Sequence, residues 1–267
     1  MSVVLQVSDT HFGTERAPVV EALVALARQQ RPDLVVLSGD ITQRATPAQF
    51  RAARACVDRL AAPVLAIPGN HDIPLFDLPT RLTRPYAAFA QAFGPELEPV
   101  HASNDLLVLC VNTTRRWRHQ NGEVSPAQIE RVAARLRTAD HAQLRIVVVH
   151  QPAAVLRPQD AHDLLRGHAA ALARWAEAGA DLVLGGHIHL PYVMALPGLA
   201  RPLWVVQAGT AVSSRVRAGV PNSVNLLRWG AGVPVGCCAI EQWDFDAAGA
   251  AFVPGPVTWT TPARVRS

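Results

Sequence analysis

Val64-Leu65-Ala66-Ile67-Pro68-Gly69-Asn70-His71-Asp72 is the stretch from which the fold can be predicted. Its first four residues form a short apolar run typical of a buried strand, and the Gly and Asn that follow are typical of the turn where a strand ends. An amide, an imidazole and a carboxylate then stand side by side. The last four residues fit two interpretations, a simple strand-to-loop turn or a reactive site at the end of a strand.

Four other short apolar runs also end at side chains of the kinds that bind metals. The five runs are followed by Asp9 and His11 (run 3–7), Asp40 (34–37), Asn70 and His71 (64–67), His150 (146–149), and His187 and His189 (182–184). Helical spacing of apolar residues between runs, as in 18–30, predicts helical connections and a mostly parallel sheet. Because the carboxyl ends of parallel strands lie along one edge, we expect an α/β fold in which these side chains converge.

The chain has 267 residues, without an internal repeat or a low-complexity linker that would divide it. We therefore expect a single domain, residues 1–267. With 49% hydrophobic and 17% charged residues, the composition is that of a globular protein with a large core. A helix is predicted within 161–178. From about residue 190 to 260, short runs broken by Gly and Pro predict a β-rich part that completes the core or forms a second sheet.

The net charge is +4, and all 25 basic residues are Arg. The absence of Lys indicates a compositional bias, so the positive balance is weak evidence for nucleic acid. Arg suits phosphate because its fork of donors can bind two oxygens at once. A small phosphorylated substrate is therefore the partner we expect, with nucleic acid as a less favoured alternative. The sequence leaves open whether the protein forms a homo-oligomer.

The four cysteines indicate the compartment. They show no spacing typical of a zinc site, and we expect buried, reduced thiols: Cys56, Cys110, Cys237 and Cys238. The N-terminal run 2–7 leads directly into polar residues and leaves no room for a signal peptide. No apolar run approaches the roughly 18 residues needed to span a bilayer. We therefore expect a cytoplasmic protein with no membrane partner.

The order of the strand-end residues resembles that of a known family. Asp9-x-His11, Gly39-Asp40, Gly69-Asn70-His71-Asp72, His150 and Gly186-His187-x-His189 are similar to the motifs of the calcineurin-like metallophosphoesterases, and most of all to the bacterial class III cyclic-nucleotide phosphodiesterase branch. The resemblance covers residues 9–189. It implies a four-layer α-β-β-α sandwich of two mixed sheets flanked by helices, with the metal site at the strand carboxyl ends and the part at about 190–260 completing the second sheet.

The resemblance also implies which residues bind each of two metal ions. By matching position, Asp9, His11 and His189 would hold the first ion, Asn70, His150 and His187 the second, and Asp40 both. A carboxylate suits the shared position because it presents one oxygen to each of two cations about 3.5 to 4 Å apart. Nitrogen and oxygen ligands without thiolate suit manganese, iron or zinc, as divalent or trivalent ions. The purple acid phosphatase branch has a Tyr where this chain has Gln43, so no tyrosinate-bound ferric ion is expected.

His71 and Asp72 are the predicted catalytic residues. In the family, the His that matches His71 faces the substrate, where it can stabilise the transition state or protonate the leaving oxygen. Asp72 is then placed to fix the tautomer of His71 and raise its pKa, and the alternative for Asp72 is a turn or helix cap. The expected reaction is direct attack on phosphorus by a hydroxide held between the metals, with both cations neutralising phosphate charge.

The predicted function is therefore metal-dependent hydrolysis of a phosphodiester, with cyclic nucleotides as one candidate substrate. A phosphomonoesterase, a nucleotide pyrophosphatase or a nuclease would keep the same metal motifs, and a non-catalytic scaffold of the same fold is a more distant alternative. No substrate-binding residue is assigned. An Arg cluster, Arg115, Arg116 and Arg118, could bind phosphate, although a solvated surface is the favoured interpretation. Residues 73–95 or 113–122 could form a lid.

Overall fold

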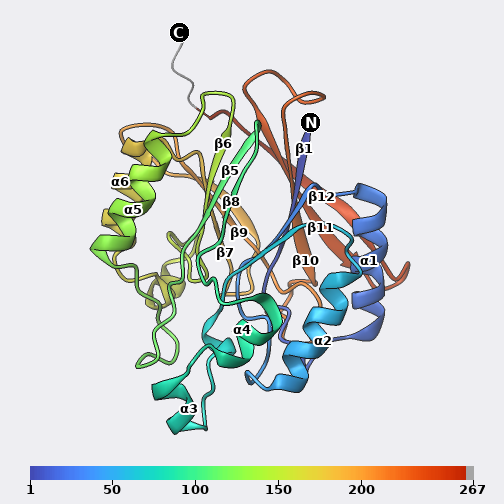
Figure 1. The fold of residues 1–267 in the computed structure, drawn as a ribbon. Helices are drawn as coiled ribbons and strands as arrows, with labels where there is room; N and C mark the ends of the chain where they lie inside the picture. Colours follow the sequence, from blue (N-terminus) through green and yellow to red (C-terminus); the bar gives the residue numbers. More distant parts are fainter. Residues whose placement is uncertain (263–267) are drawn as a thin grey trace.

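Two six-stranded sheets lie face to face at the centre of the computed structural model, which describes residues 1–262. Helices cover the outer face of each sheet, so the molecule has four layers in the order α-β-β-α (Figure 1). The predicted fold class, two mixed sheets flanked by helices, is confirmed.

The first sheet has the strand order β12-β11-β10-β1-β2-β3. Its strands are β1 (Ser2–Val7), β2 (Leu34–Leu37), β3 (Val64–Ala66), β10 (Ser223–Trp229), β11 (Cys238–Asp246) and β12 (Ala251–Thr260). β1, β2 and β3 run parallel, whereas β10 pairs antiparallel with β1, and β11 and β12 continue antiparallel.

The second sheet has the strand order β4-β5-β6-β7-β9-β8. Its strands are β4 (Val100–Ala102), β5 (Leu106–Cys110), β6 (Leu144–Val148), β7 (Leu182–Gly185), β8 (Tyr192–Ala195) and β9 (Trp204–Gln207). The four central strands are parallel, and antiparallel β4 and β8 form the two edges.

We expected the C-terminal part, about 190–260, to complete the second sheet. This expectation is only partly correct. Only β8 and β9 do so, while β10, β11 and β12 extend the first sheet. The reason is that β2 occupies just one edge of β1. Its other edge pairs with β10, from Ser2 opposite Trp229 to Gln6 opposite Asn225. The buried side-chain amide of Asn225 donates to Gln6 across this pair, so the register also satisfies two buried polar groups.

The helices pack on the outer faces of both sheets (Figure 1). Helices α1 (Ala17–Gln30) and α2 (Pro47–Asp58) cover the first sheet, and α5 (Pro126–Arg137) and α6 (His168–Ala178) cover the second. The helix predicted within 161–178 is divided, because Gly167 adopts φ +86° and separates α6 from the 3-10 helix η2 (Pro158–Asp163).

A smaller helical segment follows β3. Asn70-His71-Asp72 forms the 3-10 helix η1 (Asn70–Asp72), and the chain continues through the short helices α3 (Leu78–Thr83) and α4 (Ala87–Phe93). Helix α4 packs on α2, with the rings of Phe89 and Phe50 6.1 Å apart. Residues 73–95 are thus partly helical; whether they act as a lid stays a prediction.

The apolar runs of the sequence are buried on both faces of each sheet. In β2, Leu34 and Val36 lie in the core between the two sheets, whereas Val35 and Leu37 face the helices. This explains why the strands read as continuous apolar runs rather than as alternating ones. All four cysteines are free thiols, but only three are buried as expected, because Cys237 is half-buried. No helix among residues 1–262 has the length and apolarity needed to cross a membrane, and the cytoplasmic location stays a prediction.

Candidate metal centre

The seven predicted metal ligands converge from five strand ends, as the sequence analysis predicted. Three of these strands belong to the first sheet (β1, β2 and β3) and two to the second (β6 and β7), so the site lies where the carboxyl ends of both sheets meet. The seven side chains fall into two groups that share one carboxylate, Asp40.

The first group contains Asp9, His11 and His189. The Nε2 atoms of the two imidazoles lie 3.1 Å apart, and Nε2 of His189 lies 3.4 Å from Oδ1 of Asp9. All three side chains offer ligand atoms within 4.8 Å of one another. Two imidazoles and one carboxylate that point at a common centre form the kind of donor set that binds a divalent transition metal.

The second group contains Asn70, His150 and His187. Nε2 of His150 lies 3.3 Å from Oδ1 of Asn70 and 3.3 Å from Oδ1 of Asp40. The imidazole of His187 packs edge-on against that of His150, with ring centroids 5.2 Å apart. His187 also offers a nitrogen within 4.8 Å of the ligand atoms of His150 and Asp40.

The carboxylate of Asp40 stands between the two groups. Its Oδ1 faces His150, and its Oδ2 lies 3.8 Å from Nε2 of His11 in the first group. The backbone N–H of His71 donates to Oδ1 at 2.8 Å and so holds the carboxylate in this orientation. One oxygen of Asp40 therefore faces each group.

One unpartnered atom indicates that the site fits a metal ion. Nδ1 of His187 is buried and lacks a hydrogen-bond partner. Burying a polar group without a partner is costly, and a cation bound to this nitrogen would compensate for that cost. The donors are nitrogen and oxygen without thiolate, as the sequence predicted. The assignment of each residue as a ligand stays a prediction.

Burial and neighbouring charges shift the pKa values of these groups in different directions. Burial raises the pKa of Asp9, but the hydrogen bond and charge of His189 outweigh burial and lower it to about 2. Burial lowers the pKa of His11 to about 3, despite the attraction of Asp40. For His150, burial acts to lower the pKa, but the negative charge of Asp40 raises it to about 9. His150 must therefore release its proton when a cation binds.

Backbone strain is concentrated at these residues. Among residues 1–262, nine non-glycine residues have positive φ, and five of them are predicted ligands: Asp9 (52°), His11 (41°), Asp40 (50°), His187 (75°) and His189 (56°). This conformation is unfavourable for residues with a side chain and persists where the surroundings impose it, commonly at functional sites. The sequence gives no direct sign of this feature.

Glycines next to the ligands allow the close approach of the strand ends. A Cβ at Gly69 would lie 2.1 Å from the backbone nitrogen of Asp40, and a Cβ at Gly186 would lie 2.6 Å from Oδ2 of Asp9. Both distances are far below van der Waals contact. The close approach of the backbone at these two positions therefore requires a residue without a Cβ.

The predicted contact between Asp72 and His71 is wrong. The carboxylate of Asp72 accepts hydrogen bonds from the backbone N–H groups of Gly69, Ile41 and Thr42 at 2.8–2.9 Å. It therefore closes the turn and ties two strand-end loops together, which agrees with the alternative interpretation of a turn residue. Burial and the charge of Asp40 raise its pKa to about 7.

His71 has other partners. Its Nδ1 lies 3.1 Å from the backbone carbonyl oxygen of Gln43, and its Nε2 lies 3.1 Å from a guanidinium nitrogen of Arg215. Because a carbonyl only accepts, Nδ1 carries a proton and Nε2 faces the cavity as an acceptor. Gln43 and Arg215 therefore occupy the place that the sequence analysis gave to Asp72.

A polar cavity of about 400 Å³ opens at the metal site. Besides the predicted residues, its lining includes Gln43, Arg44, His119, Gln120, Asp163 and Arg215. Arg215 was missed because it lies beyond residue 190, where no motif gave information. Its guanidinium also donates to Oε1 of Gln43 at 2.9 Å, and within residues 1–262 no carboxylate pairs with it.

The Arg cluster of residues 115–118 does not line this cavity. Arg115 binds Gln128 and Arg118 binds Glu123, while Arg116 donates to the carbonyl of Leu82. These contacts tie residues 113–122 to their neighbours, so the structure supports the surface interpretation of the cluster over the phosphate-binding one. His119, which is exposed, does line the cavity.

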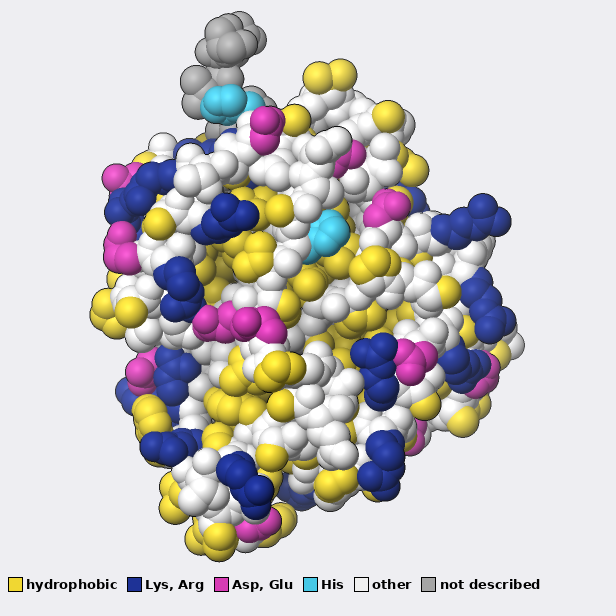
Figure 2. Space-filling model, in the orientation of Figure 1, with side chains coloured by type: hydrophobic (Ala, Val, Ile, Leu, Met, Phe, Trp, Pro, Cys, Tyr) yellow, Lys and Arg dark blue, Asp and Glu magenta, His cyan; other side chains and the backbone are white. Residues whose placement is uncertain are grey.

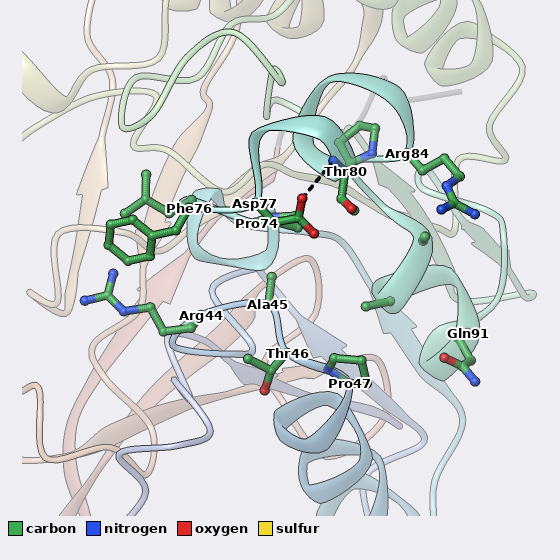
Figure 3. Close-up of a pocket in the computed structure, with 14 residues that line it drawn as sticks. Arg44, Ala45, Thr46, Pro47, Pro74, Phe76, Asp77, Thr80, Arg84 and Gln91 are labelled. Atoms are coloured by element: carbon green, nitrogen blue, oxygen red, sulfur yellow. Dashed lines mark hydrogen bonds between the residues drawn. The ribbon is translucent and has the colours of Figure 1, made fainter.

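A second, larger cavity has a volume of about 630 Å³ (Figure 3). The start of α2 and the segment with α3 and α4 form its walls, which are mostly apolar. Arg44 and Phe76 lie next to each other at one end, with the guanidinium 5.5 Å from the ring centroid. Arg44 lines both cavities.

Comparison with known proteins identifies relatives of the N-terminal two thirds of the chain. Residues 2–191 match the family model described as calcineurin-like phosphoesterase. This range takes in all five strand ends that carry the predicted metal ligands.

Two curated relatives match shorter segments. A probable cyclic nucleotide phosphodiesterase from Synechococcus is 34% identical over 80 residues, which is 27% of this chain and 31% of that protein. The glycerophosphodiester phosphodiesterase GpdQ of Enterobacter lignolyticus is 39% identical over 79 residues, 25% of this chain and 28% of that protein. The chain thus matches less than a third of the length of each relative.

A solved structure agrees over the whole fold. A dimetal phosphatase from Danio rerio superposes with a TM-score of 0.70 and 14% sequence identity, and the match covers 98% of this chain and 99% of that one. At this identity the likeness establishes the fold alone.

Proposed function

The chain belongs to the calcineurin-like phosphoesterase family, and we propose that it hydrolyses small phosphodiesters with the help of two metal ions. The observation that carries this proposal is the position of Asp40, with one carboxylate oxygen toward His150 and the other toward His11. A shared carboxylate between two groups of nitrogen and oxygen donors is the arrangement expected for a pair of cations that act on one phosphoryl group.

The residues that would hold the ions are those of the two groups. Asp9, His11 and His189 would bind the first ion, Asn70, His150 and His187 the second, and Asp40 both. When bound, two cations neutralise charge on the phosphate oxygens and lower the pKa of water enough for it to serve as a nucleophile. The choice among manganese, iron and zinc remains open within this proposal.

The chain's own side chains would serve the phosphate and the leaving group. Arg215 has no carboxylate partner among residues 1–262, and its fork of donors suits two phosphate oxygens. Nδ1 of His71 donates its proton in a hydrogen bond to the carbonyl of Gln43, so Nε2 is the atom that can exchange a proton in the cavity. Once Arg215 engages the phosphate, Nε2 would take up a proton from water, and the resulting imidazolium of His71 would give that proton to the leaving oxygen as its bond to phosphorus breaks.

Two observations support a small diester as the substrate. Both curated relatives are named as phosphodiesterases, one of cyclic nucleotides and one of glycerophosphodiesters. The cavity at the site is about 400 Å³, which suits a small molecule. On the face seen in Figure 2, basic side chains are dispersed among acidic and apolar ones, without the continuous basic stripe typical of nucleic-acid binding.

A substrate panel tests the proposal. The purified full chain, loaded separately with Mn²⁺, Zn²⁺ or Fe²⁺, is assayed on bis(p-nitrophenyl) phosphate, p-nitrophenyl phosphate, cyclic nucleotides, glycerophosphodiesters and short single-stranded DNA. We expect kcat/KM for the diester to exceed that for the monoester at least tenfold. Equal rates on both, or a preference for DNA, would overturn the proposed substrate class. A wild-type chain that binds no metal would overturn the proposal altogether.

A further inference from the structure

Asp163 lies at the metal site although no motif assigns it a role. It is the last residue of η2 and is only 9% exposed. Its Oδ1 lies 3.5 Å from Nε2 of His187 and accepts a hydrogen bond from the side-chain amide of Gln120 at 3.0 Å. Its Oδ2 lies 3.2 Å from the exposed imidazole of His162. Asp163 is therefore held by Gln120, from another loop, and by its neighbour His162, with one oxygen toward a predicted ligand.

The two nitrogens of His187 have different surroundings. Nε2 faces the carboxylate of Asp163, whereas Nδ1 is buried and has no hydrogen-bond partner. A carboxylate only accepts hydrogen bonds, so it favours the tautomer with the proton on Nε2. That tautomer leaves the lone pair on Nδ1, the nitrogen without a partner. The backbone N–H of His187 donates to Asp9 and fixes the start of the side chain at the site.

We propose that Asp163 is a positioning residue that holds His187 in the Nε2–H tautomer, so that Nδ1 binds the second metal ion. A histidine that binds a metal commonly donates its other ring N–H to a carboxylate, which sets the ring orientation and makes the ligand more basic. Asp163 meets that requirement from η2, outside every motif of the sequence. This inference rests on the proposed function, because it assumes that a metal ion binds at His187.

Metal affinity of the full chain tests the inference without relying on activity. The variant is Asp163→Asn, and the matched control is Asp160→Asn in the same 3-10 helix. Asp160 is 5% exposed, and its carboxylate pairs with Arg217 at 2.9 Å rather than with a predicted ligand. Zn²⁺ binding to the metal-free proteins is measured by competition with a chromophoric chelator. We expect Asp163→Asn to weaken the second binding step about 10- to 100-fold, and Asp160→Asn to change it less than twofold.

A spectroscopic readout separates positioning from simple loss of structure. Two-bond ¹H–¹⁵N correlations of the metal-free wild type are expected to show His187 with its proton on Nε2, and Asp163→Asn is expected to shift the proton distribution toward Nδ1. Wild-type Zn²⁺ affinity in Asp163→Asn, an equal loss in the Asp160→Asn control, or an Nδ1–H tautomer in the wild type would each overturn the inference. These outcomes differ from failure of the proposed function, which would appear as a wild type that binds no metal or hydrolyses no diester.

Discussion

The two neighbouring cavities differ in how the chain builds them. The metal cavity is the smaller, about 400 Å³ against 630 Å³, and its polar lining comes from loops spread between residues 40 and 215. The apolar cavity is made by two short segments, 44–47 and 74–91. Size therefore does not identify the reactive site. The reactive groups gather where the strand ends of the two sheets bring distant residues together. Substitutions in the two cavities test whether only the polar cavity carries the activity.

The largest effect is expected for Asp40→Ala. This change removes the carboxylate shared by both ligand groups, so we expect loss of both metal ions and a fall in diester hydrolysis of about 10³-fold or more. Elemental analysis and the bis(p-nitrophenyl) phosphate assay measure both results. Asp77→Ala in the apolar cavity is the control. Asp77 caps α3 by accepting from Thr80, so its loss should cost about 1 kcal/mol of local stability and leave the metal content unchanged. Two bound metals in Asp40→Ala would contradict the shared-ligand assignment.

His71→Ala is expected to have the next largest effect. The ring nitrogens of His71 are held by Gln43 and Arg215, and His71 is not among the seven predicted ligands, so the metal content should stay at the wild-type value. Loss of a proton donor typically lowers turnover about 10²- to 10⁴-fold. Metal analysis and kcat for diesters with leaving groups of different basicity measure this. The loss should be smallest for p-nitrophenolate, which needs no proton to leave. A uniform loss across leaving groups would contradict proton donation.

Asp40 and His71 show which features of the site the sequence could predict and which it could not. The convergence of seven side chains followed from apolar runs that each end in a polar group, because parallel strands align their carboxyl ends. The partners of His71 could not be predicted in this way. Gln43 reaches it through a backbone carbonyl, and Arg215 comes from a loop after β9 that no motif marks.

The sequence pattern also could not predict which sheet each C-terminal strand joins. Short alternating runs predict strands, but they do not indicate which sheet edge is free. The pairing of β10 with β1 depends on the open edge of β1 and on the contact of Asn225 with Gln6. Asp72 shows the related limit at the site: a carboxylate next to a histidine in sequence bonds to three backbone N–H groups instead.

Arg215→Ala is expected to have an intermediate effect. A charge-assisted hydrogen bond to phosphate contributes about 1.5 to 3 kcal/mol, so kcat/KM for diesters should fall roughly 10- to 100-fold with metal content unchanged. Arg116→Ala is the matched control, because Arg116 donates to the carbonyl of Leu82 and lies outside the cavity. Inhibition by inorganic phosphate provides a second measurement, and its inhibition constant should rise only in Arg215→Ala. Equal effects of the two substitutions would mean that general positive charge, not a specific contact, attracts the substrate.

The smallest effect is expected in the apolar cavity, for Ala88→Leu. Ala88 lies on α4 and lines the cavity, where open volume can accept the larger side chain with a stability change within about 0.5 kcal/mol. For bis(p-nitrophenyl) phosphate, kcat/KM should change less than twofold, since none of the reactive groups lies there. The informative comparison is a diester with a bulky apolar alcohol. If Ala88→Leu raises KM only for that substrate, the apolar cavity holds the alcohol group, and Arg44, which lines both cavities, marks the passage between them.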